Sequence, residues 1–518
     1  SFLFYYPPAS KDFIKGNNDL QLLFKSMVLN GTRSMISSIR ESRDTALIKI
    51  FEKWQSNKSF LAKQYSLPLK QRKTDLSSIE AQTEYLEKEL SIKSSGFRNQ
   101  QKSSQTMSAD VVKNLEKDES AIEFVRFKLI RNNRSDSIMY AAYILTRNDS
   151  IPVFVPLCEE RQLQQLFDSA GTTATSMVSR FYRGAEVRNK NAAVTLGNAL
   201  YKLVWQPLEP YLKGIKTVSY SPAGKLYSIA FHALPVDSNT VLMDKYVLQQ
   251  YTSTRQVVLR DQGIANSQLK SITLFGDAAF SLDSAGIVKS KARKEERNIV
   301  GTSRYTLPGR GSRGGTWTNL PGTAEEVKKI RSVFEEKKIN ARAFTQTNAT
   351  EENLKALSGN SPQVLHIATH GFFLSEPDIM GKESGLTNKN TYSVAEDPLL
   401  RSGLVFSGGN YAWSGKAPIE GIEDGIATAY EISQLNLSNT ELVVLSACET
   451  ALGDVKGSEG VFGLQRAFKM AGVKKMIVSL WQVPDKETAE LMTAFYSYWL
   501  KGKTINEAFA QAQAEMRT

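Results

Sequence analysis

The sequence contains very little cysteine or histidine. Its 518 residues include two cysteines, Cys158 and Cys448, and three histidines, His232, His366 and His370. Two thiols cannot build the disulfide framework of a small secreted domain, so we expect a cytoplasmic protein. With so few thiols and imidazoles we also predict no structural zinc site, no other metal and no cofactor.

Long apolar runs are missing as well. The longest, such as residues 151–158, fall far short of the ~18–20 residues that a membrane-spanning helix needs, so no membrane partner is expected. The chain begins at Ser1 without a signal pattern, which is typical of a piece of a longer protein. A composition of 41% hydrophobic and 23% charged residues excludes a wholly disordered chain. Chains above ~250–300 residues divide into domains, so we expect at least two.

The net charge of +12 is unevenly distributed. Residues 1–135 contain 23 Lys and Arg against 15 Asp and Glu, and residues 289–313 contain 8 against 2. A basic excess can mark a nucleic-acid partner. Aromatic residues are not interleaved with these basic residues, however, so we favour a solvated helical face and a mobile loop. Nucleic acid is kept as an alternative partner.

Residues 1–135 have the periodicity of helices. Apolar residues recur every three or four positions from Ile36 to Trp54, which predicts one helix face. Residues 76–90 carry a short heptad stripe, and residues 108–131 are again periodic. We predict a helical region over residues 1–135, either a coiled-coil hairpin or the end of a helical repeat array.

The pattern changes at about residue 136. Two β-prone runs, 139–146 and 151–157, are joined by a polar loop and predict a hairpin. Helices are expected at about 159–170 and 191–213. Further strands are predicted at 217–221, 226–230, 246–251 and 256–259.

From residue 271, short apolar runs alternate with helical segments. The predicted strands are 271–275, 341–344, 364–369, 441–447 and 475–480. The predicted helices are 324–337, 351–357, 460–471, 486–500 and 504–516. This alternation predicts an α/β fold with a doubly wound, mostly parallel sheet and helices on both faces. Two insertions, 281–319 and 374–430, interrupt it, and the first, which is basic and glycine-rich, is predicted to be disordered.

Two of these strands end in reactive residues. Residues 364–369 lead into His370 and Gly371, and residues 441–447 lead into Cys448. Active sites of open α/β sheets lie beyond the carboxyl ends of the strands. If the two strands are neighbours, the His370 imidazole meets the Cys448 thiol, as an activated nucleophile requires. The amides of Gly371 and Cys448 would then hold the oxyanion. The alternative is that Cys448 is an inert core residue, as a lone cysteine after an apolar strand usually is.

The other thiol and imidazoles are interpreted as structural. Cys158 lies in the predicted hairpin with no histidine nearby in the sequence. His366 is four residues before His370 and, in one continuous strand, would point to the same face. A buried, hydrogen-bonded supporting role is expected for His366, and His232 is also predicted to be structural.

The segments HIATHGFF (366–373) and LVVLSACETALGD (442–454) resemble the CHAT domain, a caspase-like family of clan CD cysteine peptidases. The segment that follows, 457–485, is similar to the same family. Further similar segments are YAAYILTRNDSIPVFVPL (140–157), YSPAGKLYSIAFHALP (220–235), LFGDAAF (274–280) and LPGTAEEVKKI (320–330). The resemblance covers about residues 136–518. This part of the chain is similar to the C-terminal part of bacterial TPR-CHAT proteases.

This resemblance implies a fold shared with caspases, gingipains and separases. It implies that His370 and Cys448 form the catalytic dyad and that Gly371 and Cys448 supply the oxyanion hole. It also implies that residues 136–268 are a non-catalytic, protease-like half and residues 269–518 the catalytic half. The family pattern normally continues to an aromatic-rich strand after the last helix, whereas this sequence stops at Thr518.

The resemblance further implies a specificity pocket. In caspase-like enzymes this pocket is lined by residues at the ends of particular strands, and the corresponding positions here are Asp277, Ser446, Gln482 and Asp485. Two acidic residues and no arginine favour a basic or neutral P1 side chain over aspartate. Asp485 has an alternative role as the N-cap of the helix that follows it.

The leading hypothesis is a caspase-like cysteine endopeptidase that cleaves a protein partner after regulated activation. The bacterial members of the family imply stress or antiviral defence, with a CRISPR-linked or gasdermin-type substrate. An activating partner is expected at the N-terminal helices, and the loop 281–319 is a predicted site of self-cleavage. Two alternatives remain open: a catalytically silent CHAT scaffold and a nucleic-acid-responsive regulator.

Overall fold

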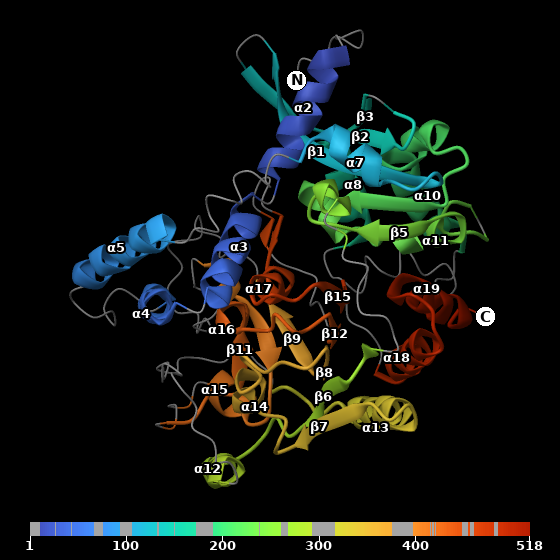
Figure 1. Ribbon diagram of the computed structural model, residues 1–518. Coiled ribbons are helices and arrows are strands. Elements are labelled where there is room, and N and C mark those ends of the chain that lie inside the picture. Colours follow the sequence, from blue (N-terminus) through green and yellow to red (C-terminus); the bar gives the residue numbers. More distant parts are fainter. Residues whose placement is uncertain are drawn as a thin grey trace, which may run out of the picture.

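A computed structural model describes most of the chain as two sheet-containing lobes with a group of N-terminal helices (Figure 1). The described residues are 11–25, 27–42, 44–66, 76–93, 106–131, 134–149, 151–171, 190–237, 239–258, 260, 268–292, 316–374, 397–414, 416, 419, 421–447, 454–455, 460–480 and 485–517. The predicted α/β architecture, preceded by helices, is confirmed.

The first lobe is built on a five-stranded sheet in the order β3-β2-β1-β4-β5. Its strands are β1 (Glu119–Arg131), β2 (Arg134–Thr146), β3 (Val153–Glu159), β4 (Thr217–Ser221) and β5 (Val247–Gln250). β1, β2 and β3 are antiparallel, which confirms the predicted hairpin, whereas β4 and β5 continue the sheet in parallel from β1. The helices α8 (Glu160–Ala170) and α10 (Lys190–Val204) bury one face around Trp205.

The expectation of a helix over residues 108–131 is wrong for most of its length. α7 (Ser108–Asn114) ends early, and β1 begins at Glu119 inside the region expected to be helical. In β1 the side chains alternate between two cores, because Ile122 and Phe124 face one and Ala121 faces the other. This period of two, with β2 and β4 on either side, fixes a central strand.

Two further predicted strands, 226–230 and 256–259, are also wrong. The described parts of these segments contain the 3₁₀ turns η3 (Gly224–Ser228) and η5 (Thr254–Val257). Gly224 has φ +53°, and a Cβ there would lie 2.4 Å from the Tyr140 hydroxyl oxygen. The close approach to β2 and the left-handed backbone explain why this segment turns instead of extending.

The second lobe contains a five-stranded parallel sheet in the order β15-β12-β8-β6-β7. Its strands are β6 (Ser271–Ala278), β7 (Asn340–Gln346), β8 (Val364–Ala368), β12 (Leu442–Ser446) and β15 (Lys475–Val478). The helices on one face are α13 (Pro321–Glu336), α18 (Asp485–Leu500) and α19 (Ile505–Glu515), and those on the other are α14 (Glu351–Lys355), α16 (Ala429–Gln434) and α17 (Leu464–Met470). Helices therefore cover both faces, as predicted.

Alternate residues of the central strands divide the core of this lobe into two layers. Leu365 and Leu445 pack on the α16–α17 side, whereas Val364 and Val444 pack on the α13–α18 side. All four are fully buried or nearly so. Because both faces are apolar, the strand sequences are continuous hydrophobic runs, which is why they were recognisable.

A second, three-stranded antiparallel sheet extends from the carboxyl side of β8. It contains β9 (His370–Phe373), β10 (Ser402–Val405) and β11 (Ile426–Thr428) in the order β11-β10-β9. The short helix α15 (Gly409–Trp413) follows β10. Part of the segment 374–430, predicted as an insertion, is thus a structured layer of this lobe.

The N-terminal helices bridge the two lobes. They are α2 (Lys11–Phe24), α3 (Met27–Glu41), α4 (Thr45–Ser66) and α5 (Ser77–Lys93). The single helix face predicted from Ile36 to Trp54 is instead divided between α3 and α4, because the Asp44 carboxylate accepts hydrogen bonds from the amides of Ala46 and Leu47 and caps α4. The helix predicted at 76–90 is confirmed as α5, which packs against α4.

α3 packs against α17 of the second lobe (Figure 1). The Gln55 amide of α4 also donates to the Gln434 side chain at 3.0 Å.

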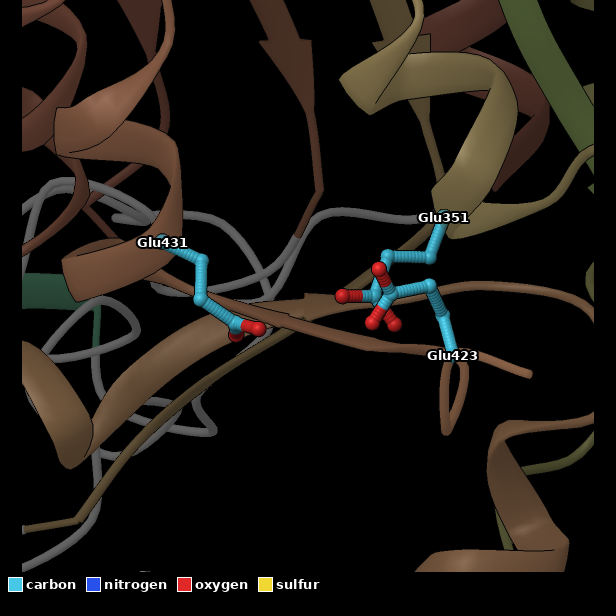
Figure 2. Close-up of side chains that lie close together, drawn as sticks. All are labelled: Glu351, Glu423 and Glu431. Atoms are coloured by element: carbon cyan, nitrogen blue, oxygen red, sulfur yellow. The ribbon is translucent and has the colours of Figure 1, made fainter. Parts of the chain in front are cut away.

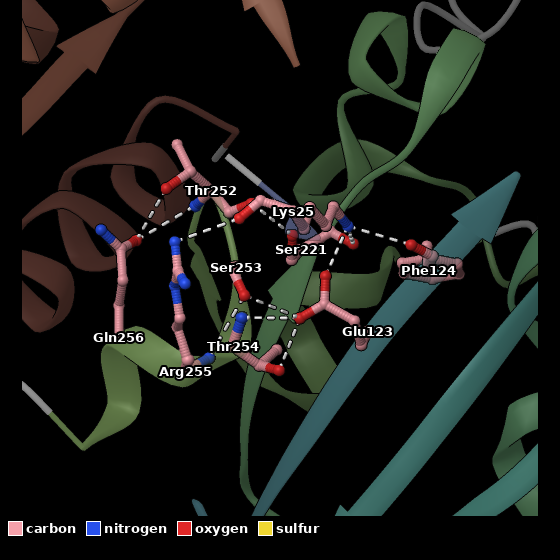
Figure 3. Close-up of polar contacts among 9 residues, drawn as sticks. All are labelled: Lys25, Glu123, Phe124, Ser221, Thr252, Ser253, Thr254, Arg255 and Gln256. Carbon is pink, nitrogen blue, oxygen red and sulfur yellow. Dashed lines mark hydrogen bonds and ion pairs between the residues drawn. The ribbon is translucent and has the colours of Figure 1, made fainter. Parts of the chain in front are cut away.

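A buried lysine attaches the N-terminal helices to the first lobe (Figure 3). Lys25, after α2, places its Nζ 2.5 Å from Glu123 Oε1 of β1, and both side chains are at most 5% exposed. The same ammonium donates to the carbonyl oxygens of Phe124 and Ser221. Glu123 Oε2 in turn accepts from the Thr254 amide at 2.7 Å. Burial lowers the pKa of Lys25, although Glu123 opposes that shift.

No helix among the described residues combines the length and apolar character needed to cross a membrane.

Candidate active site

The strands that lead to the predicted dyad are neighbours. β8 and β12 pair in parallel, with Ala368 opposite Ser446. His370 follows Ala368 by two residues, and Cys448 follows Ser446 by two residues. Cys448 itself lies outside the described residues. The prediction that the two strands are adjacent is confirmed.

The His370 side chain lies among aromatic rings and against a backbone carbonyl. Its ring centroid is 4.9 Å from that of Phe280 and 5.0 Å from that of Trp317. Its Nε2 is 2.7 Å from the carbonyl oxygen of Thr318. A carbonyl can only accept, so Nε2 carries a proton and donates it. In the neutral imidazole this contact leaves Nδ1 as the basic nitrogen.

The carbonyl that contacts His370 belongs to residues 316–320, which we call the strap. Asn410 holds the Trp317 end, accepting from the Trp317 amide at 2.7 Å and donating to its carbonyl at 2.9 Å. At the other end, the Thr323 hydroxyl donates to the Leu320 carbonyl at 2.7 Å. Thr318 is thus supported on both sides.

The strap corrects the prediction that residues 281–319 are disordered. α12 (Ser284–Ala292) forms one end of that segment, and the strap forms the other. Residues 293–315, which include most of the basic run, lie outside the described residues. Sequence reasoning missed Trp317, Thr318 and Asn410, because all three fall in segments treated as insertions. The available signal was a pair of tryptophans, Trp317 in the strap and Trp413, whose ring contacts it.

His366 and His370 do not share a face, contrary to expectation. β8 ends at Ala368 and His370 begins β9, so the strand is not continuous. His366 faces the α13–α18 side, where its ring contacts Tyr496. The expected buried supporting role of His366 is confirmed by its full burial and its polar partners.

These partners form a buried polar chain beneath the carboxyl edge of the sheet. The Ser446 hydroxyl donates to Glu326 Oε2 at 3.1 Å, and Glu326 Oε1 lies 3.1 Å from His366 Nε2. His366 Nδ1 is 3.2 Å from the Tyr496 hydroxyl. Burial, together with the nearby Glu326, raises the pKa of Tyr496 well above its ordinary value and keeps it a donor. This buried polar network links β12, β8, α13 and α18.

The predicted pocket residues lie in different environments. Asp277 is half-buried at the carboxyl end of β6 with φ +50°, and Gln346 at the end of β7 has φ +51°. The Gln346 amide donates to the Asp277 carboxylate, and the Asp277 amide donates to the Thr323 hydroxyl at 2.8 Å. Left-handed backbone at a non-glycine residue costs about 1–2 kcal/mol, and such strain concentrates at functional sites.

The remaining predicted site residues are less completely described. The Ser446 hydroxyl is engaged by Glu326, on the α13–α18 side of the sheet. Gly371 is buried in β9 opposite Leu404. Gln482 lies outside the described residues, as does the side chain of Asp485, the first residue of α18.

The two structural residues predicted in the first lobe are buried. Cys158 is 2% exposed, and burial raises the pKa of its thiol to about 12. His232 Nε2 lies 3.2 Å from the Leu248 carbonyl, and burial lowers the pKa of this imidazole. A protonated thiol is a poor nucleophile, which supports the structural interpretation of Cys158. The burial of His232 and its contact with a backbone carbonyl support the same interpretation for that residue.

An acidic cluster lies elsewhere in the second lobe (Figure 2). Glu351 of α14, Glu423 and Glu431 of α16 place carboxylate oxygens within 4.8 Å of one another. Lys355 already occupies the position a cation would take, because its Nζ is 2.7, 2.9 and 3.0 Å from Glu351, Glu423 and Glu431 respectively. Burial lowers the pKa of Lys355, but the three carboxylates outweigh burial and hold it well above the ordinary value. The cluster is thus an internal network of ion pairs that joins α14, the segment around Glu423 and α16.

A parallel sheet covered by helices on both faces, with a histidine just beyond the carboxyl end of a central strand, defines an open α/β protein with its candidate site where such folds place it. The CHAT domain family model matches residues 194–518, and the chain belongs to this family. Residues 140–157, which also resemble the family, lie outside that match.

Curated relatives match a smaller part of the chain. Tetratricopeptide repeat protein 28 of Mus musculus is 24% identical over 209 residues, and that of Homo sapiens is 34% identical over 203 residues. Each match covers 38% of this chain and 8% of the relative, so the chain corresponds to a small part of those proteins. A chain of the Saccharomyces cerevisiae separase–securin complex superimposes with a TM-score of 0.40 at 8% identity, covering 85% of this chain and 32% of that chain.

Proposed function

We propose that the chain is a cysteine endopeptidase in which Cys448 is the nucleophile and His370 the general base. The observation that carries the proposal is the in-register pairing of β8 with β12. Ala368 lies opposite Ser446, and His370 and Cys448 each follow two residues later in the sequence. A His370 ring fixed by the Thr318 carbonyl supports it, because a base must be oriented toward the proton it accepts. Membership of the CHAT domain family supports the same chemistry.

The proposed reaction follows the ordinary course of thiol acyl transfer. The Cys448 sulfur attacks the scissile carbonyl carbon, and the thiol proton passes to His370. The amides of Gly371 and Cys448 hold the oxyanion. Collapse of the tetrahedral intermediate breaks the carbon–nitrogen bond. The departing amine takes the proton from His370, and the acyl group stays on Cys448 as a thioester. Water, deprotonated by His370, then hydrolyses the thioester and restores the thiol.

We further propose that Asp277 sets the P1 preference. Its carboxylate lies at the carboxyl edge of β6, next to β8, and its left-handed backbone is held by Gln346 and Thr323. A carboxylate at this edge favours a basic P1 side chain. Ser446 contributes through Glu326 rather than by direct contact, whereas Gln482 and Asp485 stay as proposed pocket residues. Strict cleavage after aspartate among peptides with P1 Arg, Leu or Asp would contradict this assignment.

The N-terminal helices are proposed to receive the activating partner. They contact the first lobe through Lys25 and the second through Gln55, so a partner that moves them acts on both lobes at once. α5 also exposes Tyr85 and Ile92, which are 65% and 63% exposed. A protein substrate, a cytoplasmic location and a role in bacterial defence belong to the same proposal.

Covalent labelling tests the dyad directly. The probe is a peptidyl acyloxymethyl ketone with P1 arginine, and mass spectrometry locates the thioether. We expect labelling at Cys448, loss in Cys448→Ala, and labelling slowed about 100-fold in His370→Ala because the base contributes at least that much. Cys158→Ala is the matched control and should label normally.

Two results would overturn the proposal. The first is equal labelling rates in wild type and His370→Ala, which would mean that the imidazole does not activate the thiol. The second is labelling that persists in Cys448→Ala. A silent scaffold predicts the first result, so the same experiment separates that alternative from the enzyme.

A further inference from the structure

Asn410 is a buried residue that hydrogen-bonds Trp317 and Phe280, whose rings both contact His370. It is 6% exposed and lies in α15. Its Oδ1 accepts from the Trp317 amide, and its Nδ2 donates to the Trp317 carbonyl and, at 2.8 Å, to the Ser281 hydroxyl. Its own backbone amide donates to the Phe280 carbonyl at 3.1 Å.

The residues that Asn410 bonds lie next to the His370 side chain. Trp317 immediately precedes Thr318, whose carbonyl accepts the Nε2 proton of His370. Phe280 and Trp317 are the two rings that contact the imidazole. The Asn410 side chain therefore holds the Trp317 backbone next to the Thr318 carbonyl that selects the tautomer, and the Asn410 backbone amide holds the Phe280 backbone.

The element that carries Asn410 is itself tied to the His370 backbone. Val405, at the end of β10, pairs with His370 across the antiparallel ladder. The tight turn that follows leads to Gly409, where an added Cβ would lie 2.7 Å from Val405 and 2.9 Å from the Gly425 carbonyl. The β10–α15 segment thus contacts the His370 backbone through Val405, and it holds the strap beside the His370 side chain through Asn410.

We propose that Asn410 is a positioning residue that, through the strap, holds His370 as the Nε2–H tautomer with Nδ1 directed to the nucleophile. The inference rests on the proposed function for the identity of the base. An amide is required because Trp317 presents both a donor and an acceptor, and only a side chain with both can match it. A carboxylate of the same shape keeps one bond and loses the two donated ones.

The test combines ¹⁵N spectroscopy of the histidines with labelling kinetics. Only three histidines are present, so ¹⁵N-histidine spectra of wild type and His370→Gln assign the His370 ring. We expect wild type to show the Nε2–H tautomer, and Asn410→Ala to show a mixture of tautomers. With the P1-arginine ketone, the maximal inactivation rate should fall about 100-fold in Asn410→Ala while KI stays unchanged, because misorienting a catalytic group has about this effect.

Two further variants keep the test independent of general stability. Asn353→Ala removes another amide, 7% exposed, whose Nδ2 donates to the Asn348 carbonyl rather than to the strap, and should alter neither readout. Asn410→Asp keeps the shape and the bond from the Trp317 amide, and should reproduce the tautomer mixture if Asn410→Ala does not fold. A wild-type tautomer together with a wild-type inactivation rate in Asn410→Asp overturns the inference.

Failure of the proposed function looks different from failure of this inference. If labelling persists in Cys448→Ala, the proposed function fails, while the ¹⁵N spectra still report whether Asn410 orients His370. If labelling depends on Cys448 and His370 but Asn410→Asp and Asn410→Ala behave as wild type, only the positioning role is wrong.

Discussion

Replacing Lys355 with methionine removes the cation from the acidic cluster and nearly preserves its volume. The ammonium lies within 3.0 Å of three carboxylates, and Glu351 is 1% exposed. Removing one partner of a buried ion pair typically costs about 3–5 kcal/mol. Because Glu431 is 36% exposed and partly screened, we expect a loss near 3 kcal/mol. For a lobe of this size that corresponds to roughly 6–12 °C in Tm.

The loss should depend on pH in a defined direction. The pKa of Lys355 is raised above its ordinary 10.5, so its contribution is fully present below that value and is lost only as the pH rises through the higher folded value. Burial raises the pKa of Glu351 and of Glu423. On acidification these carboxylates are protonated first, which removes their repulsion in the variant. The difference between wild type and Lys355→Met should therefore shrink from pH 8 to pH 5.

Calorimetry at the two pH values measures this difference. Lys329→Met, which breaks an exposed pair with Glu325, is the control and should change the free energy of unfolding by less than about 0.5 kcal/mol. Adding Glu423→Gln to Lys355→Met should recover part of the loss by removing one repelling charge. A difference that is equal at pH 5 and pH 8 would refute the electrostatic reasoning and leave only lost packing.

Three further predictions follow from buried groups. Lys25→Met leaves Glu123 buried without its cation and should cost about 3–5 kcal/mol in a urea melt, with faster hydrogen exchange in α2, and an unchanged melt would contradict it. Gly276→Ala places a Cβ 2.6 Å from a side chain of α13 and should cost about 1–3 kcal/mol, whereas Gly16→Ala, inside α2 with nothing within 4 Å, should stabilise by about 0.5–1 kcal/mol, since alanine is the better helix former. Cys158, with a pKa of about 12 against an ordinary 9.0, should resist thiol reagents in the native state, and stability should fall as the pH rises above 9.0 because the unfolded thiol ionises first. Rapid native-state labelling of Cys158 would show that reasoning to be wrong.

The parallel sheet of the second lobe was predictable because its strands are buried on both faces. Residues 364–368 and 442–446 are uninterrupted apolar runs except for His366 and Ser446, and the structure pairs them as adjacent strands. The reverse holds for β1. Its position between β2 and β4 overrides a local periodicity that resembled a helix, because tertiary pairing decides between two weak local preferences.

The candidate site divides in the same way. The sequence singled out His370 and Cys448, because a reactive side chain directly after a buried strand is a local pattern. The residues that surround His370 could not be found this way, since Thr318 acts through its backbone carbonyl and Asn410, which holds the strap, lies 92 residues after Thr318 in the sequence. Every residue has a backbone carbonyl, so the identity of Thr318 gives no sign of this contact, and it is seen only in the folded structure.

The sequence alone was enough to predict the α/β class, the five strands of the parallel sheet in the second lobe, and the two residues proposed to react. Hydrophobic runs and short motifs are local features of the sequence, so they can be recognised before the fold is known. Three features emerge only in the folded chain: segments taken for insertions contact the His370 ring, His366 belongs to a separate buried polar network, and Lys355 fills the acidic cluster. Each of these depends on contacts between residues far apart in the chain, and distance in sequence carries no information about distance in space until the core has formed.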